Sequence, residues 1–167
     1  MALKTYILKF FKLKSAYKSP TMETTTDNLD LNNVNNFILP ITKAKVIKVY
    51  DCDTITVAFR FKNSVDIKTY KVCVRLNGID SPEIKTNNPD EKECGIKARD
   101  YLRDILMDKE IELTDVSYDK YGRILAEVYL DGQHINQRIL DDKMAIKYTG
   151  GTKKKNFDWK TYMNNYK

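Results

Sequence analysis

The sequence predicts an α+β fold of mainly β structure, a small five-stranded barrel with peripheral helices. Polar and apolar residues alternate in five segments, which is typical of strands with one face on a core. Two other segments repeat their apolar residues at helical spacing. A chain of 167 residues with 42% hydrophobic residues is the usual size of one domain and can form a packed core.

The predicted strands come in two groups. The first group covers residues 43–50, 54–61 and 67–79, and the second covers residues 110–119 and 123–132. The Asp131–Gly132 pair is a turn signal at the end of the second group. The two carboxylates of Asp51 and Asp53 lie in the tight connection between the first two strands, where side chains can converge on a ligand.

The first predicted helix begins at Pro89, because proline suits the first helical turn and three acidic residues follow it. Its apolar stripe consists of Ala98, Tyr101, Leu102, Ile105 and Leu106. A second, shorter helix is predicted at 135–144. The resulting order, β-β-β-α-β-β-α, is that of a partly closed barrel, of which the five-stranded OB-fold is the commonest type.

The chain is predicted to divide into three parts. Residues 1–20 carry five lysines and no acid, with apolar residues at about helical spacing. This pattern fits a basic amphipathic helix in a membrane or targeting contact, and it equally fits a solvated tail. Two lysines interrupt the apolar run that a signal peptide needs. Residues 21–42 are predicted to be a polar linker, and residues 43–167 the folded domain.

Charge and cysteine usage narrow the chemistry. The net charge of +6 favours a polyanionic partner, such as nucleic acid or an anionic membrane surface. Three cysteines without a CxxC spacing argue against a disulfide framework and favour an intracellular location, with organelle or membrane association also compatible. His134 is the only histidine, which excludes multi-histidine metal sites and most Ser-His and Cys-His mechanisms.

Three separated segments contain the candidate functional residues. Each segment alone is typical of an ordinary polar turn. The first segment contains Asp51, Asp53 and Thr54; the second contains Arg75, Asp80, Ser81 and Glu83; the third contains Asp119, Lys120, Tyr121, Gly122 and Arg123.

Taken together, the three segments resemble the staphylococcal nuclease family from about Lys43 to about Gly151. The resemblance rests on D-x-D-T at 51–54, R-x4-D-[ST]-P-E at 75–83 and D-K-Y-G-R at 119–123, with G-x-x-A in the intervening helix. It implies an OB-fold barrel and a calcium-dependent, sugar-nonspecific nuclease that hydrolyses phosphodiester bonds of DNA and RNA. Single-stranded or unpaired substrates and a monomer are expected.

The resemblance also implies a role for each matched residue. The calcium ligands would be the carboxylates of Asp53 and Asp80 and the backbone carbonyl of Ser81, where the family uses Thr. Glu83 would lie at the attacking water, and Arg75 and Arg123 would bind the scissile phosphate.

Five further residues are expected to support these groups or to bind the substrate. Lys120 and Tyr121 match positions near the terminal phosphate of a bound nucleotide, and Tyr148 lies near the family's base-stacking tyrosines. Asp51 and Thr54 are expected to hold Asp53 in place.

The implied chemistry is physically reasonable. Calcium takes about six to eight oxygen ligands, so two carboxylates, a carbonyl and waters are sufficient. Two guanidinium groups can make charge-assisted bonds to phosphate oxygens. Glu83 could remove the water's proton or only orient the water, and the sequence leaves both open.

Two rival functions remain. One is a catalytically silent module that only binds nucleic acid or a protein partner, although the complete acidic and arginine set favours an enzyme. The other makes residues 1–20 a membrane anchor for a generic domain.

The cysteines and the C-terminal segment raise further questions. Cys52 stands where the family has glycine. A positive φ would strain a cysteine at this position, and its thiol could bind a soft metal. The preferred interpretation is a tolerated turn residue whose side chain points away from the ion. Cys73 is predicted to be buried. Lysines 153–155 with Phe157, Trp159 and Tyr162 could hold a nucleic-acid strand or form a solvated run and a packing tail.

Overall fold

The computed structural model describes residues 25–61, 68–151 and 157–165. Within these ranges, residues 36–60 and 69–165 form one compact unit, and the remaining described residues belong to another. The second unit contains turns, at Asp27–Asn28 and Leu31–Asn32, and no helix or strand among its described residues. The predicted amphipathic segment 1–20 and lysines 153–155 lie outside the described residues.

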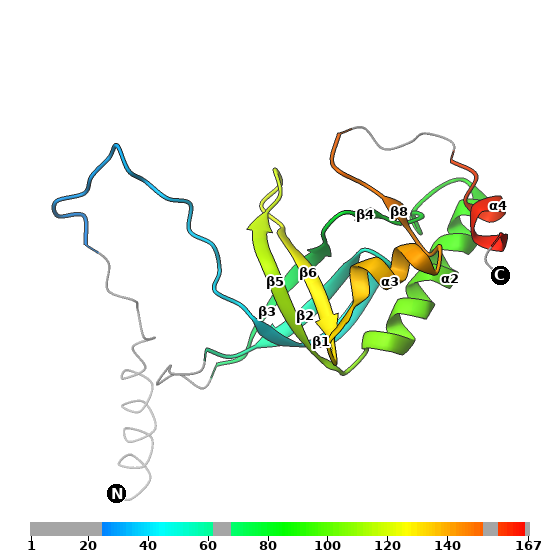
Figure 1. The fold of residues 1–167 in the computed structure, drawn as a ribbon, viewed down its shortest axis with the longest axis horizontal. Coiled ribbons are helices and arrows are strands. Elements are labelled where there is room, and N and C mark those ends of the chain that lie inside the picture. The colour runs from blue at the N-terminus through cyan, green and yellow to red at the C-terminus, as the bar shows by residue number, and fades with distance from the viewer. Residues whose placement is uncertain (1–24, 62–67, 152–156, 166–167) are drawn as a thin grey trace, which may run out of the picture. The chain divides into compact units, whose positions relative to one another are not determined.

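Five strands form a barrel, as predicted (Figure 1). They are β1 (Lys43–Asp51), β2 (Thr54–Phe59), β3 (Tyr70–Leu76), β5 (Glu110–Tyr118) and β6 (Ile124–Leu130). The sheet order is β3-β2-β1-β5-β6, and a parallel pairing between β3 and β6 closes the ring. All other barrel pairings are antiparallel. This arrangement confirms the OB-fold type.

Three helices and three short strands accompany the barrel in the described residues. The helices are α2 (Pro89–Leu106), α3 (Ile135–Asp141) and α4 (Trp159–Asn164), and the additional strands are β4 (Ile79–Asp80), β7 (Gln133–His134) and β8 (Ile146–Lys147). The single strand predicted at 67–79 is wrong in its extent, because Gly78 has a φ of +77° and turns the chain between β3 and β4. No helix among the described residues has the length and apolarity to cross a membrane.

The α2 helix begins as predicted. The Asn88 side chain accepts hydrogen bonds from the backbone N–H groups of Asp90 and Glu91, at 3.0 and 3.3 Å, which satisfies donors that have no partner within the helix. The buried face of α2 packs beside β1 (Figure 1). It consists of Cys94, Gly95, Ala98, Leu102 and Leu106.

The structure shows no left-handed strain at Cys52 and corrects the prediction that Cys73 is buried. Cys52 is fully buried in the barrel core, and it is not among the described residues with a positive φ, so this turn carries no left-handed strain. Burial raises the pKa of its thiol well above the usual value, which disfavours the thiolate that a soft metal needs. Cys73 is exposed rather than buried, because Val74 takes the inward position and successive side chains alternate. All three cysteines are free.

The C-terminal aromatic residues form a packing tail. Trp159 and Met163 on α4 are buried, and α4 packs against α2 near its first turn, where Lys160 forms an ion pair with Asp90 (Figure 1). The rings of Phe157 and Tyr162 contact the indole of Trp159 edge-on, with centroids 4.8 and 6.2 Å away. These aromatic side chains therefore contribute to the core instead of offering free faces to bases.

Replacing Trp159 by Ala should lower the free energy of unfolding by about 3–5 kcal/mol, because it removes a large buried side chain and leaves a cavity between α4 and α2. Urea denaturation followed by circular dichroism measures the change. The control is Lys160→Ala, which removes only an exposed ion pair and should leave stability nearly unchanged. Equal stability of the two variants would contradict the packing role of α4.

Candidate active site

Two barrel strands place the first two candidate segments side by side. Thr54 at the start of β2 lies opposite Arg75 in the antiparallel β2–β3 register. Arg75 in turn lies opposite Leu125 across the parallel β3–β6 pair. The turn that contains Asp51 and Asp53 therefore opens directly beside the arginine, although more than twenty residues separate them in the sequence.

Arg75 bridges the two predicted metal-binding carboxylates. Its Nη1 lies 2.7 Å from Oδ2 of Asp53, and its Nη2 lies 3.5 Å from Oδ1 of Asp80. Nη2 also donates a hydrogen bond to the carbonyl oxygen of Ile79 at 3.1 Å. All three charged residues are buried, so each charge depends on its partners for compensation.

Asp53 has partners on both carboxylate oxygens. The Thr54 hydroxyl donates to Oδ1 at 2.8 Å, and the Ser81 backbone N–H donates to Oδ2 at 3.1 Å. Burial alone would raise the pKa of Asp53, but the charge of Arg75 and the hydrogen bond from Thr54 outweigh it and hold the pKa below its usual value. Asp53 is therefore ionised at neutral pH.

Asp51 lies beside Asp53 but differs from it in its hydrogen-bond partners and in its pKa. Its Oδ1 is buried and has no hydrogen-bond partner within the described part of the chain. Burial, together with the charge of Asp53, raises the pKa of Asp51 to about 7. A buried carboxylate oxygen next to another carboxylate favours the approach of a proton or a cation.

The segment that carries Glu83 is held against α2. The backbone N–H of Glu83 donates to Oε1 of Glu91 at 3.3 Å, and the hydroxyl of Thr86 donates to Oε2 of Glu91 at 3.0 Å. A Cβ atom at Gly95 would lie 2.9 Å from the carbonyl oxygen of Pro82, so only glycine permits this approach. The G of the G-x-x-A pattern therefore sets the position of the Glu83 backbone.

The third segment is the hairpin between β5 and β6. Asp119 accepts hydrogen bonds from the backbone N–H groups of Tyr121 and Arg123, each at 2.8 Å, and from Nε of Arg123 at 2.7 Å. Burial opposes ionisation, but the bonds from Arg123 hold the pKa of Asp119 below its usual value. Gly122 adopts a φ of +77°, which the turn requires. The turn thus fixes the Arg123 guanidinium.

Aromatic residues flank the arginines. Lys120 and Arg123 lie 5.0 and 5.6 Å from the ring centroid of the exposed Tyr121. Tyr148 follows β8, whose pairing with β4 and the hydrogen bond from the Tyr148 N–H to the Gly78 carbonyl bring its ring 6.0 Å from the Arg75 guanidinium. The structure thus places Tyr148 beside Arg75, one of the candidate site residues.

One cavity of about 560 Å³ joins the three segments. The predicted residues that line it are Asp51, Asp53, Thr54, Arg75, Glu83, Lys120, Tyr121, Arg123 and Tyr148. Asp80 and Ser81 do not line this cavity but contact Arg75 and Asp53 from behind it. We refer to it below as the main cavity.

Sequence reasoning missed three residues of the main cavity: Tyr50, Cys73 and Gly151. Cys73 lies two residues before Arg75 on β3, and strand alternation alone would place both on the same face. Tyr50 directly precedes the D-x-D-T segment and is not part of that motif.

The donor set fits a hard divalent cation. Among the described residues, no group of three or more carboxylate, histidine or cysteine side chains forms a metal cluster. The expected ligand set needs only two carboxylates and a carbonyl, and a carboxylate offers about four lone-pair sites, of which Asp53 uses three. Oδ1 of Asp51, which has no hydrogen-bond partner among the described residues, is a further oxygen atom that a cation could bind.

The fold and the site define an OB-fold domain with a cavity of carboxylates and arginines, a combination suited to binding phosphate esters. Comparison with known proteins gives the family. The chain belongs to the staphylococcal nuclease homologue family, whose model matches residues 73–166, more than half of the chain. The D-x-D-T segment lies before the matched range and supports the assignment independently.

Individual relatives agree with this assignment. A micrococcal nuclease of Shigella flexneri is 30% identical over 115 residues, which cover 64% of this chain and 58% of that protein. A thermonuclease of Staphylococcus hyicus is 30% identical over 103 residues, 60% of this chain and 56% of that protein. An uncharacterized endonuclease of Haemophilus influenzae is 32% identical over 104 residues, 62% and 51% respectively. The chain thus spans about half the length of these curated relatives.

Replacing Gly95 by Ala should destabilise the protein by about 1–3 kcal/mol, because the added Cβ meets the Pro82 carbonyl oxygen. Helix propensity alone would give the opposite sign, since alanine in a helix interior is favoured over glycine by about 1 kcal/mol. Urea denaturation measures the sign. The backbone amide chemical shifts of Glu83 and Ile84 should also move. The matched control, Lys97→Ala on the exposed side of α2, should change neither; a stabilised Gly95→Ala variant would refute the contact.

Proposed function

We propose that this protein is a calcium-dependent, sugar-nonspecific nuclease that hydrolyses phosphodiester bonds of DNA and RNA. The observation that carries the proposal is the convergence of three distant segments on the main cavity, with Glu83, Arg75 and Arg123 all lining it. Membership of the staphylococcal nuclease family, and relatives named thermonuclease and micrococcal nuclease, support the same reaction.

In the proposed site, calcium would be held by the carboxylates of Asp53 and Asp80 and by the backbone carbonyl of Ser81. When bound, the ion supplies positive charge next to the phosphate and a coordination site for water. Arg75 keeps the two carboxylates close together and its charge helps to keep Asp53 ionised, and the Ser81 N–H bond to Asp53 fixes the backbone that presents the carbonyl.

The side chains of the cavity divide the remaining work. Glu83 accepts a hydrogen bond from the attacking water and orients it toward phosphorus. Arg75 and Arg123 donate to the phosphate oxygens, where negative charge grows as the bond to the leaving oxygen breaks. Because Asp119 fixes Arg123 in its hairpin, this guanidinium is in place before the substrate arrives.

Substrate binding is assigned to the aromatic side of the main cavity. The exposed ring of Tyr121 and the ring of Tyr148 offer faces on which unpaired bases can stack, and Lys120 supplies a charge for a neighbouring phosphate. Stacking tolerates every base, so single-stranded DNA and RNA are both suitable substrates.

The proposal is tested by release of acid-soluble nucleotides from single-stranded DNA and RNA with calcium, with magnesium and with EDTA. Glu83→Ala and Arg123→Ala should each lower the rate by about 100-fold or more, because each removes a preorganised group in the cavity. The matched controls Glu93→Ala and Arg60→Ala alter side chains outside the cavity and should retain full activity.

Circular dichroism must show that both cavity variants remain folded. Tight binding of oligonucleotides without any cleavage would identify the rival function, a catalytically silent module. Full activity of both variants would refute the assigned roles.

Calcium binding can be measured without catalysis. A ligand that binds only the folded state stabilises it, so calcium at 100 times its Kd should add about 2.7 kcal/mol and raise the melting temperature. Asp80→Asn should abolish this shift by removing a proposed ligand. The control Asp115→Asn alters an exposed carboxylate at a φ of +50°, which asparagine tolerates, and should keep the shift. An unchanged shift in Asp80→Asn would refute the ligand assignment.

A further inference from the structure

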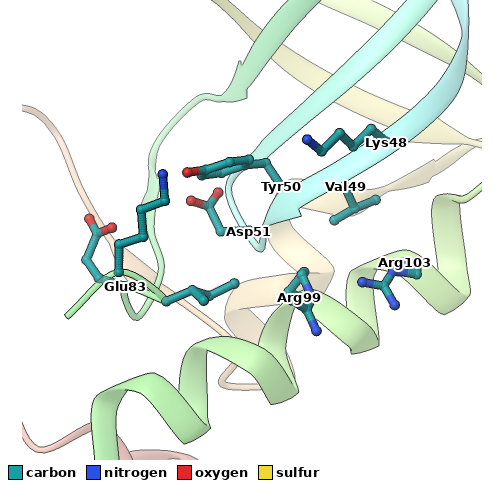
Figure 2. Close-up of a pocket in the computed structure, with 9 residues that line it drawn as sticks. Lys48, Val49, Tyr50, Asp51, Glu83, Arg99 and Arg103 are labelled. Atoms are coloured by element: carbon teal, nitrogen blue, oxygen red, sulfur yellow. The ribbon is translucent and has the colours of Figure 1, made fainter. Parts of the chain in front are cut away.

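A second cavity, of about 320 Å³, opens between the end of β1 and α2 (Figure 2). We call it the basic cleft, because four of its nine lining residues are basic. These four are Lys48 on β1, Lys85 after the Glu83 segment, and Arg99 and Arg103 on α2. None of the four has a role in the proposed reaction. The only acidic residues in the lining are Asp51 and Glu83.

The basic cleft meets the main cavity at three residues. Tyr50, Asp51 and Glu83 line both cavities. In Figure 2, the side chains of Tyr50 and Asp51 extend from the end of β1 on the side of the Glu83 segment. A nucleic-acid strand that lies over Glu83 can therefore continue from one cavity into the other.

The two arginines are positioned by one acid. Asp100 accepts hydrogen bonds from Nε and Nη2 of Arg99, at 3.0 and 2.9 Å, and lies 3.2 Å from Nη1 of Arg103. Figure 2 shows Arg99 and Arg103 one helical turn apart on α2. Asp100 does not itself line the cleft. Asp100 holds the two guanidinium groups in position. Nη1 of Arg99 and Nη2 of Arg103 take no part in these contacts with Asp100.

The mouth of the cleft combines charge with an aromatic face. The Tyr50 side chain is 42% exposed, and the amines of Lys48 and Lys85 each lie 5.5 Å from its ring centroid. Exposed aromatic rings between flexible cations are the usual elements of surfaces that bind single-stranded nucleic acid.

We propose that the basic cleft binds the substrate strand on the side of the scissile phosphate opposite to Tyr121 and Tyr148. Lys48, Lys85, Arg99 and Arg103 would contact backbone phosphates, and Tyr50 would stack on a base. This inference rests on the proposed nuclease function, which identifies the bound strand as DNA or RNA. It adds a binding site beyond the residues that surround the scissile phosphate.

The test compares two double variants that each remove the charges of two lysines. Lys48→Ala/Lys85→Ala alters the cleft, whereas Lys43→Ala/Lys45→Ala alters exposed lysines of β1 whose partners are Glu112 and Asp108. Each pair lowers the net charge of +6 by two, so long-range attraction changes equally.

Binding is measured by fluorescence anisotropy of a labelled single-stranded DNA dodecamer in EDTA, where calcium-dependent cleavage is absent. The cleft variant should bind about tenfold more weakly than the parent. The slope of log K against log salt concentration should shrink by about 0.7 for each phosphate that the variant no longer neutralises. The control variant should change affinity less than twofold and keep the slope. Equal weakening of binding in the two variants would overturn the inference, because only overall charge would then matter.

Cleavage kinetics give a second readout. In the cleft variant, KM should rise more for a dodecamer than for a dinucleotide, because only the longer strand reaches the cleft. A KM that rises equally for both lengths would also overturn the inference.

Failure of the proposed function gives a different result. A protein that cleaves nothing but whose dodecamer binding depends on the cleft would retain this inference and lose the nuclease assignment. A protein that cleaves normally in the cleft variant, with unchanged KM for the dodecamer, would retain the nuclease and lose the inference.

Discussion

The contact between Arg75 and the carboxylates of Asp53 and Asp80 is the interaction on which the site depends. It ties the turn before β2, the strand β3 and the short strand β4 together through one guanidinium group. Burying two carboxylates is costly unless a positive partner with good geometry accompanies them. The same requirement keeps both carboxylates adjacent and Asp53 ionised, which is the state a hard cation needs.

The other side chains of the site are positioned by local features of the backbone. The Asp119 turn holds Arg123, the β4–β8 pair holds Tyr148, and the absence of a side chain at Gly95 lets the Glu83 segment lie against α2. These features belong to the barrel, the β4–β8 pair beside it and the helix α2. The groups are therefore placed before a substrate binds, which is the condition under which hydrogen-bond donors accelerate a reaction most.

The barrel strands and both predicted helices were predictable, because alternation and helical spacing are local signals. The parallel β3–β6 closure and the two-residue strands β4 and β8 were not, since they depend on distant pairing that leaves no periodic trace. For the same reason the place of Tyr148 could not be fixed from its neighbours. Cys73 was predicted to be buried, which is wrong. It lies two residues before Arg75, and strand alternation places both side chains on the same face of β3.

The two cavities differ in a way that bears on which phosphodiester bond of a strand the proposed nuclease would cut. Tyr121, Tyr148 and Lys120 line the main cavity, the four cations line the basic cleft, and Glu83 lines both. A site for terminal nucleotides needs binding groups on one side only. If both sides bind the strand as proposed, the scissile phosphate lies between two held segments, because binding energy from each side then fixes its position. This arrangement favours cleavage within a strand over removal of its last nucleotide.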